Sequence, residues 1–171
     1  MNKRMAIFLL FLCVAAHAQT LNVPQCYQEK TQWCWAGCTQ ATLSYYGKSV
    51  SQSTIAQHGS HGENNWIWLW GQSENPYRSS IQNLLAIWKI PSSAVSSALS
   101  QSQVQSEINA GRPVQIRWGW DSGGGHFVLC KGINGSTLYV MDPWSGPTVN
   151  SYSWVVKGNG HTWTHTLYIN R

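Results

Sequence analysis

Three residues in this sequence are of the types, and in the chain order, that thiol-dependent acyl transfer requires. Cys34 lies in the run Gln28-Glu-Lys-Thr-Gln-Trp-Cys-Trp-Ala, His126 follows three glycines, and Asp142 opens an Asp-Pro-Trp segment. A cysteine attacks a carbonyl carbon as its thiolate, a histidine takes up the thiol proton, and a carboxylate holds the imidazole in the required orientation. The residues therefore predict a triad of Cys34 as nucleophile, His126 as base and Asp142 as orienting group.

Cys34 is expected at the N-terminus of a helix. Residues 34–46 carry no helix breaker except Gly37, and Gly47 follows them as a C-terminal cap. The N–H groups and the dipole at the start of a helix favour a thiolate, so they lower the pKa of a cysteine there. A backbone N–H at this position, together with the Gln28 amide beside it, would also suit a developing oxyanion.

His126 and Asp142 are expected on two adjacent strands. His126 starts a β-rich segment, 126–132, and Asp142 follows a second one, 137–141, with an Asn-Gly turn between the two segments. Strands joined in this way can set the carboxylate against one imidazole nitrogen and leave the other nitrogen for the thiol.

The remaining sequence is helical in its first part and β-rich in its second. Further short helices are expected at 53–57, 80–88 and 103–110, and further β-rich segments at 113–120, 151–157 and 162–170. The Ser- and Gln-rich stretch 92–106 is expected to connect the two halves. This order predicts an α+β fold with a cleft where the helical half meets an antiparallel sheet.

The first 18 residues are predicted to be a signal peptide. A basic start precedes an apolar run and the small-residue cleavage site Ala16-His17-Ala18. We therefore expect one mature domain, 19–171, that is exported to the periplasm or the extracellular space and does not enter the membrane. Attachment of a lipid to Cys13 is disfavoured, because the large Leu12 stands where a small residue is needed.

The composition excludes several classes of protein. The chain has 171 residues, of which 43% are hydrophobic and 10% charged, and its formal net charge is +5. Such a hydrophobic fraction argues against disorder, and so small a positive excess does not indicate a nucleic-acid partner.

Export would place the cysteines in an oxidising compartment, where paired cysteines form disulfides. We expect at most one disulfide, formed between two of Cys26, Cys38 and Cys130, with Cys38–Cys130 as the preferred pair and Cys34 left free.

The sequence resembles the papain-like cysteine proteases, and most of all the short bacterial members, which include secreted effector peptidases and the peptidases that process double-glycine leaders. The resemblance spans residues 23–146 and rests on four features in the family's chain order, namely Gln28, Cys34-Trp35-Ala36, His126 after a glycine run, and Asp142-Pro143-Trp144.

This resemblance implies a papain-like α+β fold with Cys34 on a central helix. It assigns Gln28 as oxyanion donor and Trp144 as a shield that keeps water from the His126–Asp142 hydrogen bond. The implied reaction is hydrolysis of peptide bonds through a thioacyl-enzyme, without a cofactor or metal. The implied partners are a peptide or protein substrate and, in a secreted toxin, a cognate inhibitor or immunity protein, and the implied state is a monomer.

Two other interpretations stay open, and a third is disfavoured. A transglutaminase-like acyltransferase or deamidase also uses a Cys-Trp nucleophile with histidine and aspartate, although its small members usually have a shorter interval between cysteine and histidine. A degenerate binding module would follow if the triad did not assemble. A zinc site built on Cys34 and Cys38 is disfavoured, because Cys-x3-Cys without a second Cys or His pair is poor spacing for structural zinc.

Overall fold

The computed structural model describes residues 19–71 and 79–171, and the predicted signal peptide lies outside the described residues. Five helices are described: α1 (Cys34–Tyr45), α2 (Gln52–Ser60), α3 (Ile81–Ile87), α4 (Gln101–Asn109) and α5 (Tyr152–Val156). The strands are β1 (Gln19–Thr20), β2 (Ser92–Val95), β3 (Val114–Trp120), β4 (Gly125–Asn134), β5 (Thr137–Asp142), β6 (Gly146–Ser151), β7 (Lys157–Gly158) and β8 (His161–Ile169). Among the described residues, no helix has the length and apolar character needed to cross a membrane.

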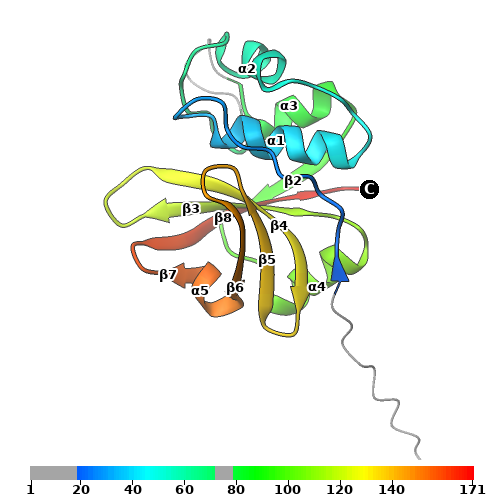
Figure 1. The fold of residues 1–171 in the computed structure, drawn as a ribbon, viewed down its shortest axis with the longest axis vertical. Helices are drawn as coiled ribbons and strands as arrows, with labels where there is room; N and C mark the ends of the chain where they lie inside the picture. Colours follow the sequence, from blue (N-terminus) through cyan, green and yellow to red (C-terminus); the bar gives the residue numbers. More distant parts are fainter. Residues whose placement is uncertain (1–18, 72–78) are drawn as a thin grey trace, which may run out of the picture.

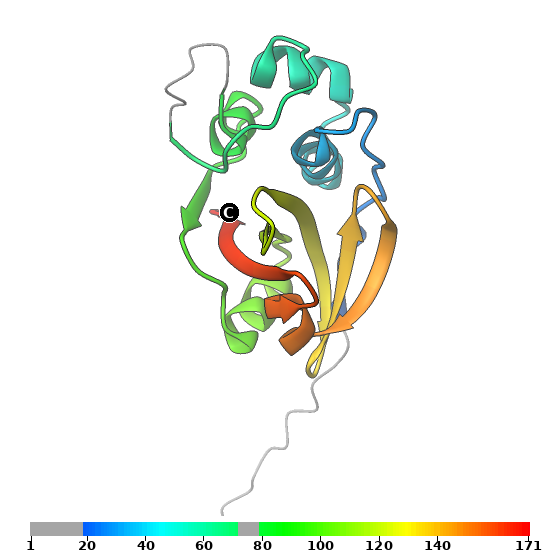
Figure 2. The ribbon, with the colours of Figure 1, turned by 90° about the vertical axis from the view of Figure 1, so that its left-hand side faces the viewer.

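One antiparallel sheet organises the second half of the chain. Its main strand order is β2-β8-β3-β4-β5-β6, with β1 paired to β4 and β7 paired to β8. Helices α1, α2 and α3 lie together on one side of this sheet, whereas α4 and α5 lie at the opposite side (Figures 1 and 2). The structure thus confirms the predicted α+β arrangement, with helices first and antiparallel strands second.

Helix α1 is the most deeply packed helix of the first half. Its residues Trp35, Ala36, Cys38, Ala41 and Leu43 are all fully buried, and the helix contacts β4 and β5 of the sheet as well as α2 and α3. Burial of so much apolar surface is a major source of stability. The helix that begins at Cys34 therefore has a fixed position relative to the strands that carry His126 and Asp142.

Gly37 allows α1 to approach the loop after β5. A Cβ atom on Gly37 would lie 2.8 Å from Cβ of Pro143 and 3.2 Å from the carbonyl oxygen of Cys26. Neither neighbour is the end of a flexible side chain, so neither could easily move aside. The absence of a side chain at Gly37 is what brings the helix and the Asp142 loop into contact.

Two regions differ from the sequence-based expectations. The segment 151–157 was expected to be β-rich, but most of it forms α5, because the Ser151 hydroxyl accepts a hydrogen bond from the Trp154 N–H and so starts a helix. The stretch 92–106 is not a simple connection. It contains β2 and the start of α4, where Ser100 and Gln103 form a capping box.

The expected Cys38–Cys130 disulfide is absent, and that prediction is wrong for this structure. Cys26, Cys34, Cys38 and Cys130 are all free thiols. The Cys38 thiol donates to the Phe127 carbonyl at 3.3 Å, whereas the Cys130 thiol donates to the carbonyl of Gly132, farther along β4, at 3.5 Å. The two buried sulfurs thus face different parts of the same strand.

The first prediction concerns the contact at Gly37. Gly→Ala in a helix is ordinarily stabilising, but Gly37→Ala should lower the free energy of unfolding by roughly 1–3 kcal/mol, because the new methyl group meets Pro143. Urea denaturation measures the change. The control is Ser44→Ala in the same helix, which should stay within about 0.5 kcal/mol of the wild type. A Gly37→Ala protein as stable as the control would show that the helix and the loop are not tightly packed.

Candidate functional site

The His126–Asp142 pair lies at one end of the sheet, on the adjacent strands β4 and β5. His126 Nε2 and Asp142 Oδ1 are 2.8 Å apart, and the two side chains are only 12% and 9% exposed. The same oxygen accepts hydrogen bonds from the backbone N–H groups of Trp144 at 2.7 Å and Ser145 at 3.3 Å. Burial raises the pKa of Asp142, but these hydrogen bonds and the charge of His126 outweigh burial and hold the pKa below its ordinary value.

The second ring nitrogen of His126 is available to interact with Cys34. Because Nε2 is paired with Asp142, the nitrogen that remains for a thiol is Nδ1. Burial lowers the pKa of His126, but hydrogen bonds with Asp142 and Cys34, and the charges of both, outweigh burial and raise the pKa from 6.5 to about 9. The structure thus brings together the three residues of the expected triad.

The start of α1 differs from the starts of the other described helices. Its N-cap residue, Trp33, makes no side-chain capping hydrogen bond, and Cys34 is the first helical residue. In the other four helices a serine hydroxyl accepts from the first turn; these serines are Ser51, Ser80, Ser100 and Ser151. The first N–H groups of a helix lack intrahelical partners and attract negative charge. The uncapped end of α1 can therefore stabilise an anion beside Cys34.

Gln28 lies in the loop that leads into α1, but its amide has other partners. Nε2 donates to the carbonyls of Lys30 at 2.8 Å and Thr31 at 3.0 Å. In this arrangement both amide hydrogens are directed at the loop, and the side chain would have to turn to reach an oxyanion. The backbone N–H of Gln28 donates to the Pro143 carbonyl at 2.8 Å, so the residue also fastens the loop that follows Asp142. Its oxyanion role stays a prediction.

The tryptophan rings beside the imidazole are those of β3. Trp120 stacks on His126, with ring centroids 6.1 Å apart and planes 14° apart, and the ring of Trp118 is 6.3 Å away. Trp144 instead is 60% exposed, and its backbone N–H is the group that reaches Asp142. Shielding by the Trp144 ring stays a prediction.

Two residues near the pair went unnoticed in the sequence. Trp118 stands directly opposite His126 in the pairing of β3 with β4, and Gln25 Nε2 donates to the Asp142 carbonyl at 2.8 Å. The alternating tryptophans before the glycine run were the available signal for Trp118. Gln25 carries no comparable signal, because its contact joins residues far apart in the chain.

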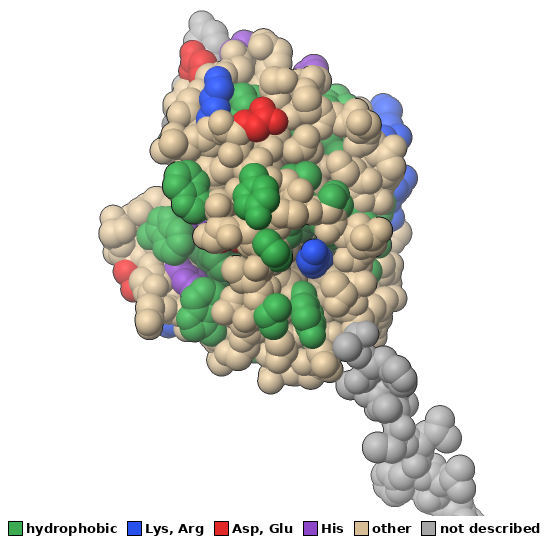
Figure 3. Space-filling view, viewed as in Figure 1, with side chains coloured by type: hydrophobic (Ala, Val, Ile, Leu, Met, Phe, Trp, Pro, Cys, Tyr) green, Lys and Arg blue, Asp and Glu red, His purple; other side chains and the backbone are tan. Residues whose placement is uncertain are grey.

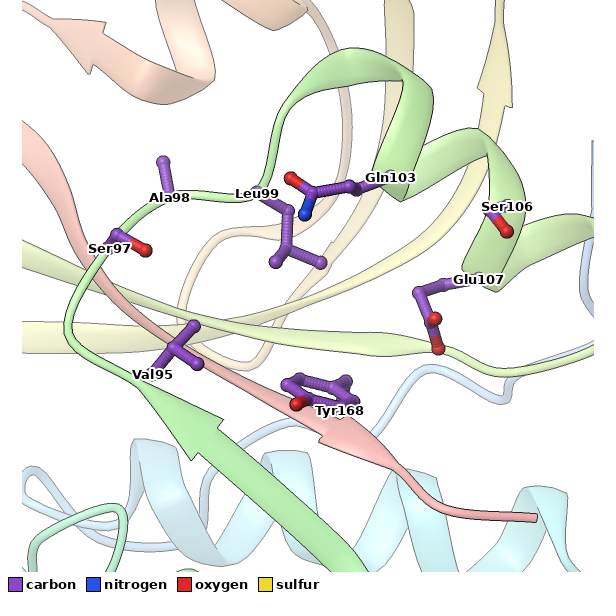
Figure 4. Close-up of a pocket in the computed structure, with 8 residues that line it drawn as sticks. All are labelled: Val95, Ser97, Ala98, Leu99, Gln103, Ser106, Glu107 and Tyr168. Atoms are coloured by element: carbon purple, nitrogen blue, oxygen red, sulfur yellow. The ribbon is translucent and has the colours of Figure 1, made fainter.

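Two cavities are lined by chain neighbours of the triad residues, though not by the triad residues themselves. A cavity of about 210 Å³ is lined by Gln32, Trp66, Ile67, Trp68, Arg117, Gly124, Gly125 and Phe127, and one of about 340 Å³ is lined by residues 27–31, Pro143 and Trp144. Hydrophobic side chains gather over the middle of the face seen in Figure 3, with histidine visible between them. A pocket of about 330 Å³ between β2, α4 and β8 (Figure 4) contains no residue of the triad. Across residues 19–71 and 79–171, no group of three His, Cys, Asp or Glu side chains could hold a metal ion.

The hydrogen bond between Asp142 and His126 generates a prediction about two variants. In Asp142→Asn the amide oxygen can still accept from the imidazole and from the Trp144 N–H, whereas in Asp142→Ala nothing can. The NMR titration midpoint of His126 should fall from about 9 in the wild type to a lower value in the asparagine variant, which lacks the negative charge. The thiol reactivity of Cys34 should decrease less in Asp142→Asn than in Asp142→Ala. Equal decreases would mean that Asp142 does not orient His126.

The two pKa shifts also predict how stability depends on pH. The raised pKa of His126 stabilises the fold fully below pH 6.5, and this contribution is lost as pH rises through about 9. The lowered pKa of Asp142 stabilises the fold above pH 3.8, and this contribution is lost as pH falls through its folded value.

The difference in unfolding free energy between wild type and Asp142→Asn should therefore be largest between pH 3.8 and 6.5, at roughly 2–3 kcal/mol. Denaturation at several pH values measures the difference. Asp121→Asn, which removes an exposed carboxylate outside this pair, should follow the wild-type curve. A difference that does not change with pH would refute the ion pair.

Comparison with known proteins identifies the family. Residues 20–166 match the Peptidase_C39 like family, and no match was found among curated proteins. A C39-like peptidase from Bacillus anthracis has a TM-score of 0.60 at 16% identity, covering 91% of this chain and 98% of that one. The peptidase domain of Streptococcus ComA, a bifunctional ABC transporter, has a TM-score of 0.62 at 11% identity, covering 88% and 100%.

A third solved structure also has a similar fold. It is a double glycine motif protease from an AMS/PCAT transporter in complex with the leader peptide, with a TM-score of 0.57 at 17% identity, covering 90% of this chain and 95% of that one. These likenesses confirm the papain-like α+β fold expected from the sequence. The chain belongs to the Peptidase_C39 like family.

Proposed function

We propose that this protein hydrolyses peptide bonds through a thioacyl-enzyme, with Cys34 as nucleophile, His126 as general base and acid, and Asp142 as the residue that orients His126. The observation that carries the proposal is the buried 2.8 Å contact of Asp142 with His126 Nε2, which leaves Nδ1 for the thiol at the uncapped start of α1. Membership of a peptidase family supports the same reaction.

The first half of the reaction forms the thioacyl-enzyme. The raised pKa of His126 favours a resting pair in which the imidazole already holds the Cys34 proton, and the thiolate of this pair attacks the carbonyl carbon of the substrate. The backbone N–H of Cys34, at the start of α1, donates to the developing oxyanion. The imidazolium then gives its proton to the leaving amine, so the peptide bond breaks and the acyl group stays on sulfur.

The second half releases the acid. His126, neutral again, takes a proton from water while the water oxygen attacks the thioester carbon. The C–S bond then breaks and the acid leaves. The proton on His126 stays with the re-formed Cys34 thiolate, which restores the starting pair. Throughout, Asp142 holds the imidazole in one orientation, because its Oδ1 is itself fixed by two backbone N–H groups. Stacking of Trp120 on the ring restricts its rotation and the access of water.

A peptide is the substrate class that the comparisons favour. The double glycine motif protease was solved with a leader peptide, and by analogy we propose a peptide or an extended protein segment for this chain. The predicted signal peptide would place the reaction in the periplasm or outside the cell.

The nucleophile assignment predicts selective alkylation. Iodoacetamide should modify Cys34 much faster than the other three described thiols. Cys38 and Cys130 are fully buried, and burial raises the pKa of both, that of Cys130 to about 12. Burial also raises the pKa of Cys26. Peptide mapping by mass spectrometry measures each rate. Selectivity should disappear in His126→Ala, and equal rates at Cys34 and Cys26 in the folded wild type would overturn the enzyme assignment.

Peptide libraries, incubated with and without an added amine, separate hydrolysis from acyl transfer. New free carboxylates at a cleavage site support the peptidase. Amine adducts at glutamine would support the transglutaminase-like alternative instead. Cys34→Ser is the matched control for both reactions and should give neither product.

A further inference from the structure

Arg117 lies in the cavity of about 210 Å³ that opens beside the triad. Two other residues that line this cavity tie it to the reacting groups: Gln32 stands two residues before Cys34, and Gly125 directly precedes His126. We call this cavity the Arg117 pocket. A substrate held across Cys34 would place a neighbouring side chain in it.

The guanidinium of Arg117 is held by two hydrogen bonds, and its other N–H groups are not used in them. Nη1 donates to the Thr164 hydroxyl at 2.9 Å, and Nη2 donates to the Gly124 carbonyl at 2.9 Å. The central carbon Cζ lies 4.7 Å from the centroid of the Trp68 ring. An arginine has five N–H donors, so these two hydrogen bonds leave three without a partner in the contacts of the described residues.

Arg117 also has no carboxylate partner among the described residues. Burial lowers its pKa, and the opposite charge that acts on it is that of the Cys34 thiolate, which raises the pKa and places the guanidinium near the sulfur. Within the part of the chain that the structure describes, the ion pairs are His126–Asp142 and Arg112–Glu107. Opposite Arg117 on β8 stands His165. Burial and the Arg117 charge lower the pKa of His165, which favours its neutral form. A half-buried cation without a carboxylate partner is only partly compensated, since burial of a charge is costly unless the charge is paired.

The backbone around Arg117 is shaped to make room for it. A Cβ on Gly125 would lie 2.8 Å from Arg117 Nη2 and 2.6 Å from the Trp118 carbonyl oxygen. The last residue of the glycine run therefore gives the guanidinium its place across the strand pair. Trp66, which is 55% exposed, and Trp68 supply apolar walls on the other side of the pocket.

We propose that the Arg117 pocket is a specificity subsite that binds the carboxylate of an aspartate or glutamate side chain next to the scissile peptide bond; this inference rests on the proposed peptidase function. The free edge of the guanidinium can bind a carboxylate through two parallel hydrogen bonds. The indole walls pack on the methylene groups of the same side chain, and the cavity volume suits one side chain rather than several.

The test compares peptide substrates that differ in one residue. Pairs with Glu or Gln at each position around the cleavage site, all with an amidated C-terminus, give a Glu/Gln ratio of kcat/KM. Wild type should prefer Glu by about tenfold to a hundredfold at one position, as expected for a charged hydrogen bond. Arg117→Gln should bring the ratio close to one, and Arg117→Glu should move the preference to Lys.

Arg112→Gln is the matched control, because Arg112 pairs with Glu107 away from the pocket, and it should keep the wild-type ratio. The ratio matters because Arg117 also joins Gly124 to Thr164. A purely structural role would slow both substrates alike and leave the ratio unchanged. That result, or equal rates for Glu and Gln in the wild type, overturns the subsite while peptide hydrolysis itself stands.

If no peptide is cleaved, the proposed function fails and binding decides the subsite. Calorimetric titration of Cys34→Ser with the same peptides should give a lower Kd for Glu than for Gln, and this preference should vanish when Arg117→Gln is added. Equal Kd values overturn the subsite. A preference that appears only with unamidated peptides would assign the carboxylate to a chain end, and the side-chain assignment would be wrong.

Discussion

The close packing of helix α1 against the loop after β5 is the contact on which the site depends. The thiol comes from the helical layer and the imidazole–carboxylate pair from the sheet, so the two layers must meet with little tolerance. Gly37 provides the close approach, and backbone or amide hydrogen bonds from Gln25 and Gln28 to residues 142 and 143 fasten the same loop. Small errors in such geometry are costly for reactions that need aligned groups.

The chain has few charged residues, which make up only 10% of the sequence. Four described helices start with a serine cap, whereas α1 starts with Trp33 and no side-chain cap. A missing cap costs helix stability of about 1 kcal/mol. Here the loss falls at the helix end that carries Cys34, the proposed nucleophile, where free N–H donors would serve the proposed reaction.

The sequence was sufficient to predict the fold class, and it singled out Cys34, His126 and Asp142, which the structure brings close together. Each motif has a strong local signal: a run after Cys34 in which Gly37 is the only breaker, a strand after the glycines, and an Asn-Gly turn that joins β4 to β5. The errors have local causes too. Segment 151–157 has β-forming residues, but the cap at Ser151 decided its conformation. The predicted Cys38–Cys130 disulfide was wrong because the helix face shared by Cys34 and Cys38 does not determine which residue of β4 the Cys38 thiol contacts. In the structure that residue is Phe127.

The contacts that sequence reasoning missed are those between distant segments. Arg117 reaches Trp68 and Gly124, and Trp120 stacks on His126, through pairings that no periodicity reveals. Side-chain orientation within a loop is equally invisible, as the Gln28 amide shows by turning to the carbonyls of Lys30 and Thr31.

The position of β8 has a consequence for the order in which the protein can fold. This strand, residues 161–169, lies between β2 and β3, and β3 in turn supports the strand that carries His126. During synthesis the helical layer with Cys34 emerges long before β8, and such non-local pairing forms slowly. The sheet stays incomplete until residues 161–169 are available to pair with β2 and β3. Cys34 therefore spends that interval without a fixed His126 beside it, and the candidate site is complete only after β8 has paired with β3.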